Sequence, residues 1–324
     1  MKRSRLVFAV LPAVVLGVAA HAQAPRTAWG DPDLQGQWSN ATLTPLQRPA
    51  DLGDKEFFTE EEARAYVRQR IAATSGDANI EADKSSGNVG SYNDAWMDRG
   101  TDIVPTRRTS LVVEPANGRV PPFTAAAQSE HERNLAHAAA HPADTPEDRY
   151  LTERCIGFGG GHAPMLPEPY NNNYYIVQTP DYVTIMAELN HEVRIIPIDG
   201  RPHLPAGVRQ WTGDSRGRFE GDTLVVETTN QIPHRHYYGV QMLNSVMSDE
   251  FRVVERFTRT GPDQIRYRAT MHDPVFTTPW TVEIFMHPQP GELVEFACHE
   301  GNYGLRGILS ATREEERRAT EGGR

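Results

Sequence analysis

The chain has 324 residues, of which 38% are hydrophobic, and a formal net charge of −10 at pH 7. An acidic protein gains no counterion-release attraction to a phosphate backbone, so we expect no nucleic-acid partner. A chain of this length can bury one large core or two small ones.

The first residues have the pattern of a secretory signal peptide. A cationic opening at residues 2–5 precedes a stretch of apolar and small residues, 6–20, and Ala20 and Ala22 supply the small side chains that a signal peptidase needs. Cleavage after Ala22 is predicted, which leaves a periplasmic or secreted protein with no membrane insertion. The alternative is a retained anchor, but the apolar stretch is shorter than the roughly 20 residues that a span requires.

The chain has only two cysteines, Cys155 and Cys298. In an oxidising periplasm they can form a disulfide that links distant segments. The alternative is a pair of buried free thiols, and both interpretations stay open because the sequence does not give the separation of the two Cα atoms.

The segment 23–105 is predicted to be an arm, a helix and a loop. Residues 23–55 are rich in Pro, Asp and Gln, which is typical of an extended arm that wraps the surface of a fold. Thr59 and Glu62 form a capping-box pattern, which predicts that a helix begins here. Residues 74–105 return to Gly, Asp, Asn and Ser and are interpreted as loop.

After residue 174 the sequence changes to short apolar and β-branched runs separated by turn residues. Within one run Ile265, Tyr267, Ala269 and Met271 share one face, and the residues between them share the other. Hairpin spacing without intervening helices predicts an antiparallel barrel or sandwich. We favour a mainly β, eight-stranded, lipocalin-like barrel that encloses room for one small ligand. The predicted strands are 174–178, 182–188, 193–198, 223–228, 251–258, 264–272, 280–287 and 293–298.

Other elements flank this strand-rich region. A short strand at 110–114 and a helix at 124–141 precede it, and a helix from 303 to about 318 follows it. No repeat of fixed period is present, so one domain is the simplest organisation. The predicted divisions are a signal peptide at 1–22, an N-terminal arm, helix and loop at 23–105, a β-barrel domain at 106–310 and a charged tail at 311–324.

Residues 213–217 match the nucleophile pattern Gly-x-Ser-x-Gly around Ser215. Such a nucleophile needs a strand before the serine and a helix after it. Here a hairpin signal and a strand follow, and turn chemistry explains the glycines and Asp214. We therefore interpret this segment as a structural turn and not as the centre of a serine hydrolase.

Histidines provide a second candidate site. In an extended segment His234 and His236 would share a face and could ligate one metal ion, with His203 and His299 as further candidates. No His-x-x-x-His helix, cysteine cluster or paired carboxylate spacing accompanies them, so no metal site is predicted. A His-ligated metallo-enzyme is kept as an alternative.

The richest set of polar side chains lies at the ends of predicted strands, where the mouth of a barrel would form. We expect a histidine, oriented by a carboxylate, to act as acid or base, and an arginine to hold a substrate carboxylate. The alternative is that these residues only cap strand edges. The candidate catalytic residues are His191, His299, Glu188, Glu300 and Tyr303, and the candidate substrate-binding residues are Arg194, Arg209, Trp211, Asn172, Asn173, Tyr174 and Asn302.

Five segments, 170–180, 191–197, 200–203, 213–229 and 299–303, together resemble a family of exported bacterial proteins, most of which have no defined function. The resemblance spans residues 106–310 and implies one coherent domain. The family is in turn similar to cofactor-independent decarboxylases of lignin-derived aromatic dimers. No catalytic motif of those enzymes can be matched residue by residue in this chain.

These observations favour a cofactor-independent lyase of the decarboxylase type that acts on a small aromatic or phenylpropanoid acid. One of the two candidate arginines would hold the carboxylate, and one of the two candidate histidines, oriented by a glutamate, would deliver a proton. No cofactor is expected, because neither a Gly-x-Gly-x-x-Gly nor a P-loop motif is present. The alternative is a non-catalytic periplasmic protein that binds an apolar or aromatic small molecule, and a homodimer is left open.

Overall fold

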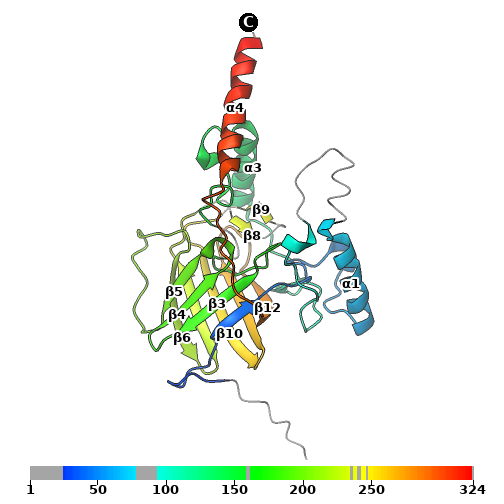
Figure 1. The fold of residues 1–324 in the computed structure, drawn as a ribbon, viewed down its shortest axis with the longest axis vertical. Coiled ribbons are helices and arrows are strands. Elements are labelled where there is room, and N and C mark those ends of the chain that lie inside the picture. Colours follow the sequence, from blue (N-terminus) through cyan, green and yellow to red (C-terminus); the bar gives the residue numbers. More distant parts are fainter. Residues whose placement is uncertain are drawn as a thin grey trace, which may run out of the picture.

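The computed structural model describes residues 25–77, 93–157, 161–233, 236–238, 242–245 and 247–322. The fold is mainly β, with a barrel-like sheet and α-helices outside it (Figure 1). The predicted signal peptide lies outside the described residues, as do His234 and the side chain of His236. Across the described part of the chain, none of the helices is both long and apolar enough to cross a membrane.

The main sheet is antiparallel and closes almost completely into a barrel. Its strands are β1 (Gly36–Ser39), β2 (Val112–Glu114), β3 (Asn173–Gln178), β4 (Tyr182–Ala187), β5 (Val193–Pro197), β6 (Asp214–Glu220), β7 (Thr223–Thr229), β10 (Arg252–Gly261), β11 (Gln264–His272) and β12 (Trp280–Pro288). Their order is β5–β4–β3–β1–β12–β11–β10–β7–β6, and β2 pairs with β12. β8 (His236–Tyr238) and β9 (Met242–Ser245) form a separate hairpin. The predicted mainly β, barrel-like architecture is confirmed, but the sheet has ten strands and not eight.

β5 and β6, at the two ends of the strand order, contact each other without pairing as a ladder in the described structure. Gly217 permits this approach, because a Cβ atom there would lie 2.9 Å from a methyl carbon of Ile196 and of Ile198. Arg194 in β5 also reaches across and donates a hydrogen bond to Ser215 Oγ in β6 at 3.4 Å. Side chains therefore close the barrel at this seam.

The predicted capping box is present at the start of α1 (Glu60–Ala73). Thr59 Oγ1 accepts a hydrogen bond from Glu62 N, and the Glu62 carboxylate accepts one from Thr59 N. This helix lies beside the barrel (Figure 1) and packs through Ala63 on a small second hydrophobic cluster that includes Phe58.

The two other predicted helices are also present. α3 (Ala125–Ala140) begins at Thr124, and α4 (Tyr303–Gly322) extends beyond the predicted end of its helix. Both stand at one end of the barrel (Figure 1). Short 3₁₀ turns occur at η1 (Ala50–Leu52), η2 (Asp94–Trp96), η3 (Pro146–Asp148) and η4 (Leu189–His191).

Three predictions about elements are wrong. Residues 36–39, assigned to a surface arm, form β1 between β3 and β12. Residues 214–217, interpreted as a turn, begin β6, which pairs with β7 along its length. Residues 293–298 form no strand. β12 pairs with β11 on one edge and with β1 and β2 on the other. Residues 293–298 therefore have no free edge of β12 with which to pair.

The interior of the barrel is filled with side chains. The predicted alternation in β11 is confirmed, since Ile265, Tyr267, Ala269 and Met271 are all buried. Large residues from other strands, including Trp280, pack in the same core. Because side chains fill the barrel, a ligand site has to lie outside it.

Candidate functional site

A cavity of about 490 Å³ lies between the barrel and α1. Its walls come from residues 42–46, the end of α1, residues 97–99 and the segment 166–170. Leucine and proline side chains form much of this wall, and Glu168 is the acidic residue in it. We call this space the Glu168 cavity. A concave, mostly apolar space with a few polar groups is the usual form of a small-molecule site.

Glu168 is the chemically unusual group in this cavity. The residue is only 8% exposed, and burial raises the pKa of its carboxyl to about 8. Within the described structure, Glu168 Oε1 has no hydrogen-bond partner. At neutral pH the carboxyl therefore keeps its proton and is able to donate it.

Asn172 fixes the backbone on which Glu168 lies. The Asn172 side chain accepts a hydrogen bond from Glu168 N and donates one to Glu168 O, both at 2.7 Å. It also donates to the carbonyl oxygen of Asp98. Asn172 was predicted to bind substrate, and the structure instead gives it a positioning contact with Glu168.

A buried polar network anchors the same segment to the barrel. Met165 N donates a hydrogen bond to Tyr267 Oη at 2.8 Å, and Tyr267 Oη donates one to Glu255 Oε1 at 2.9 Å. Burial raises the pKa of Tyr267 well above its usual value, which keeps the hydroxyl proton available for this bond. Glu255 in turn forms an ion pair with Arg194.

Arg194 is therefore held inside the barrel core and away from the Glu168 cavity. It is 3% exposed, both of its terminal nitrogens bind Glu255, and one also contacts Ser215 and Thr228. The prediction that Arg194 holds a substrate carboxylate does not agree with this geometry, because the guanidinium is already bound to a carboxylate of the protein. Tyr174 is likewise buried in the core, at 1% exposure.

Two other arginines line the Glu168 cavity. Arg99 donates a hydrogen bond to the carbonyl oxygen of Thr74, next to the end of α1. Arg70, in the last turn of α1, has a buried Nε with no hydrogen-bond partner in the described structure. Guanidinium groups bind carboxylates through charge-assisted hydrogen bonds, so the cavity is suited to an organic anion.

The predicted acid–base histidines lie elsewhere. His191 and His299 are exposed, as are Glu300 and Tyr303, and none of these four residues lines the Glu168 cavity. Asn302 caps α4, because its Oδ1 accepts a hydrogen bond from Leu305 N.

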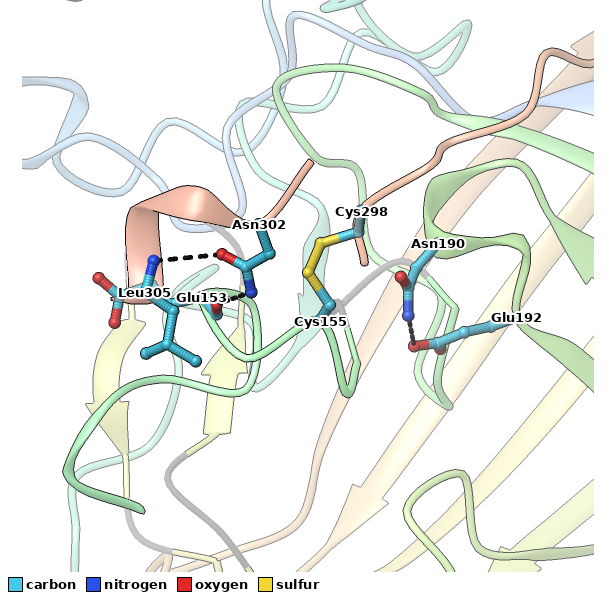
Figure 2. The surroundings of a disulfide bond; sticks show 7 residues. All are labelled: Glu153, Cys155, Asn190, Glu192, Cys298, Asn302 and Leu305. Atoms are coloured by element: carbon cyan, nitrogen blue, oxygen red, sulfur yellow. Dashed lines mark hydrogen bonds between the residues drawn. A yellow bond between two sulfur atoms is a disulfide. The ribbon is translucent and has the colours of Figure 1, made fainter. Parts of the chain in front are cut away.

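Cys155 and Cys298 form a disulfide, which resolves the question that the sequence left open. Figure 2 shows Asn302 on one side of this bond and the Asn190–Glu192 contact on the other. Further along, Val294 N donates a hydrogen bond to Glu188 at 3.4 Å. Glu188 and Asn173 line a second cavity, next to the first.

Arg209 and Trp211 lie in the long connection between β5 and β6. Arg209 donates hydrogen bonds to the carbonyl oxygens of Gln231 and Asp249, so its contacts are structural. Trp211 is half-buried.

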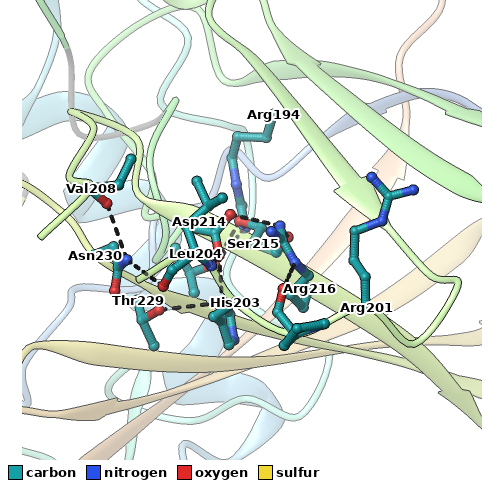
Figure 3. Close-up of polar contacts among 12 residues, drawn as sticks. Arg194, Arg201, His203, Leu204, Val208, Asp214, Ser215, Arg216, Thr229 and Asn230 are labelled. Carbon is teal, nitrogen blue, oxygen red and sulfur yellow. Dashed lines mark hydrogen bonds and ion pairs between the residues drawn. The ribbon is translucent and has the colours of Figure 1, made fainter. Parts of the chain in front are cut away.

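The same connection holds His203 against the start of β6 (Figure 3). His203 Nδ1 lies 2.7 Å from the Asp214 carboxylate, which also pairs with Arg216 at 2.6 Å. Ser215 is buried, and its hydroxyl lies 2.8 Å from Thr228 Oγ1. The Gly-x-Ser-x-Gly segment is therefore the beginning of a barrel strand, and its Asp214 holds the loop that carries His203.

The sequence reasoning missed Glu168, Arg70 and Arg99. One signal was available: Glu168 stands between two prolines in an otherwise apolar run, 163–170. A single acid in such a run is a candidate for burial and a raised pKa. The arginines gave no comparable signal, because they occur in an ordinary helix and a polar loop.

Among the described residues, no group of three or more His, Cys, Asp or Glu side chains is arranged to hold a metal ion. A comparison with protein-family models, curated proteins and solved structures finds no match to this chain. The family resemblance therefore stays a prediction, and function has to be inferred from the site itself.

Proposed function

We propose that this protein is a cofactor-independent lyase of the decarboxylase type, which acts on a small aromatic or phenylpropanoid acid in the Glu168 cavity. The proposal rests on one observation: a buried carboxyl with a pKa of about 8 lies in an apolar cavity that arginines also line. The N-terminal sequence pattern supports export to the periplasm or medium as the setting.

The residues of the cavity have distinct roles in this reaction. Arg70 and Arg99 attract the substrate carboxylate, and the apolar wall holds the ring. Glu168 donates its proton to the carbon that bears the carboxylate, and an electron pair of the conjugated π system forms the new C–H bond. The bond from this carbon to the carboxylate then breaks, its electron pair restores the π system, and carbon dioxide leaves. Glu168 is afterwards reprotonated from solvent. The net reaction joins one proton to the acid anion and releases carbon dioxide.

Glu168→Gln tests the acid directly. Its amide keeps the size of the side chain but has no acidic proton, so turnover should fall about 10²- to 10⁴-fold while substrate binding persists. The assay is mass spectrometry of a panel of hydroxylated cinnamic and benzoic acids, which follows the loss of carbon dioxide. In deuterated water the product should carry one deuteron at the carbon that lost the carboxylate.

Arg70→Ala and two histidine variants complete the test. Arg70→Ala should raise KM about tenfold or more, because a charge-assisted hydrogen bond is lost. His191→Ala and His299→Ala should keep full turnover. Recovery of every acid unchanged after incubation with the wild-type protein contradicts the proposal and favours a binding protein. Loss of activity in either histidine variant, with full activity in Glu168→Gln, contradicts the assignment of the acid.

A further inference from the structure

A second cavity, of about 480 Å³, adjoins the Glu168 cavity and shares Met97 and Tyr170 with it. Its chemistry is different. Three acidic residues line it, Asp98, Glu188 and Glu295. Among the described residues that line it there is no lysine, arginine or histidine. We call it the acidic cavity.

Glu188 is the best fixed of these acids. It is 6% exposed, and three N–H groups converge on its carboxylate, from Asn171, Asn173 and the backbone of Val294. These three donors hold the Glu188 carboxylate in one position at the wall of the cavity. Burial raises the pKa of nearby Asp98, and the charge of Glu188 raises it further. Two acids whose charges influence each other thus line the same cavity.

Asn173 adds an independent observation. Its Nδ2 donates a hydrogen bond to Glu188 at 3.3 Å, and the residue is 7% exposed. Its Oδ1 is buried and accepts no hydrogen bond from any described residue. A buried acceptor of this kind is costly unless a donor reaches it, so a ligand that carries an N–H or O–H group fits here.

Aromatic rings complete the acidic cavity. Tyr170 and Phe296 stack with their ring centroids 6.3 Å apart and their planes 15° from parallel. Trp96 also lines the cavity and is 69% exposed, so its indole is open to a ligand. Ring faces attract cations as well as apolar groups.

We propose that the acidic cavity binds an organic ammonium ion, namely a protonated primary amine joined to an aromatic or apolar body. The ammonium N–H groups donate to Asn173 Oδ1 and to the carboxylates of Asp98 and Glu188. The body packs on the rings of Trp96, Tyr170 and Phe296. This binding does not depend on the proposed decarboxylase activity, because the two cavities have separate acidic groups.

Isothermal titration calorimetry with three probes of similar size tests the ligand class. 2-Phenylethylammonium should bind saturably. 2-Phenylethanol lacks the charge and should bind at least tenfold more weakly, because it cannot form the charge-assisted hydrogen bonds that an ammonium group donates to carboxylates. Benzyltrimethylammonium keeps the charge but has no N–H donor, and should also bind more weakly. Equal affinity for the amine and the alcohol, or no binding of the amine at millimolar concentration, overturns the proposal.

Variants locate the site. Glu188→Gln should weaken amine binding about tenfold, with Glu292→Gln, a nearby exposed acid outside the cavity, as the matched control. Trp96→Ala changes an exposed side chain, so it should fold normally, and should weaken binding two- to fivefold through the lost cation–ring contact. Trp29→Ala, exposed elsewhere, should have no effect. Glu168→Gln should leave amine binding unchanged, so failure of the decarboxylase proposal and failure of this one are distinguishable. Unchanged affinity in both Glu188→Gln and Trp96→Ala places the amine elsewhere and overturns the assignment.

Discussion

At the scale of single residues, burial decides the chemistry of this protein more than residue type does. Glu168 and Glu300 carry the same carboxyl group, but Glu168 is buried, and burial raises its pKa to about 8. A group with a raised folded-state pKa binds more protons in the folded chain than in the unfolded chain. Its titration is therefore visible in the stability of the whole protein.

Glu168 should make stability fall as the pH rises. The unfolded chain releases this proton near its ordinary pKa of 4.5, and the folded chain releases it at about 8. The free energy of unfolding should therefore decrease by about 3 kcal/mol between about pH 5 and pH 8 on account of this one group. Urea unfolding of wild type and Glu168→Gln at several pH values measures the difference. Glu61→Gln, exposed on α1, serves as the control, and parallel pH profiles for wild type and Glu168→Gln contradict the raised pKa.

The sequence predicted where several candidate residues lie better than it predicted what their side chains do. Asn172, Asn173 and Glu188 were selected from the sequence and do lie beside the two cavities. Arg194 was selected with them, but its strand turns it into the barrel, where Glu255 binds it. Such differences depend on which face of a strand is buried and on partners far away in the chain, and neither is encoded locally.

At the scale of elements, the alternation of apolar and polar residues predicted a strand well where long strands pair with it on both sides. The alternation in β11 was sufficient there. β1 has four residues, Gly-Gln-Trp-Ser, too few to give a period. β6 carries glycine, aspartate and serine, which favour turns, and is a strand because β7 pairs with it along its length. Tertiary pairing overrides local preference in both cases.

The seam between β5 and β6 should be sensitive to side-chain volume. Gly217→Val places carbon atoms where the methyl groups of Ile196 and Ile198 already lie, so we expect a loss of about 1–3 kcal/mol in unfolding free energy. Gly261→Ala, at the end of β10 with open space around it, is the comparison and should change stability little. Denaturant unfolding measures both. Ile196→Ala removes the Cγ2 methyl group that meets position 217, so the loss in the double variant with Gly217→Val should be smaller than the sum of the two single losses. No loss in Gly217→Val would show that the strands do not approach so closely.

At the scale of the whole molecule, one covalent bond ties the C-terminal segment to the rest. The Cys155–Cys298 disulfide joins two residues that are 143 positions apart in the sequence. The segment between β12 and Cys298 includes Val294 and Phe296, which form part of the acidic cavity. The bond therefore holds a wall of that cavity in place as well as the base of α4.

Removal of the disulfide should destabilise the protein and loosen this wall. Replacing both cysteines by serine should lower the unfolding free energy by about 2–5 kcal/mol. Affinity for 2-phenylethylammonium should fall in the same variant, while turnover in the Glu168 cavity should change less. Calorimetry and denaturant unfolding of the oxidised protein and the double variant give both values. An unchanged unfolding midpoint in the double variant would contradict this role.

Met97 and Tyr170 belong to the walls of both cavities, so the partition between them is one layer of side chains. A ligand in the Glu168 cavity that shifts Tyr170 also changes the wall that a ligand in the acidic cavity contacts. Thermodynamic linkage then makes the influence mutual: the factor by which an acid alters the affinity for an amine equals the factor by which the amine alters the affinity for the acid. An anion and a cation bound on opposite faces of one tyrosine would also attract each other, which favours joint occupancy.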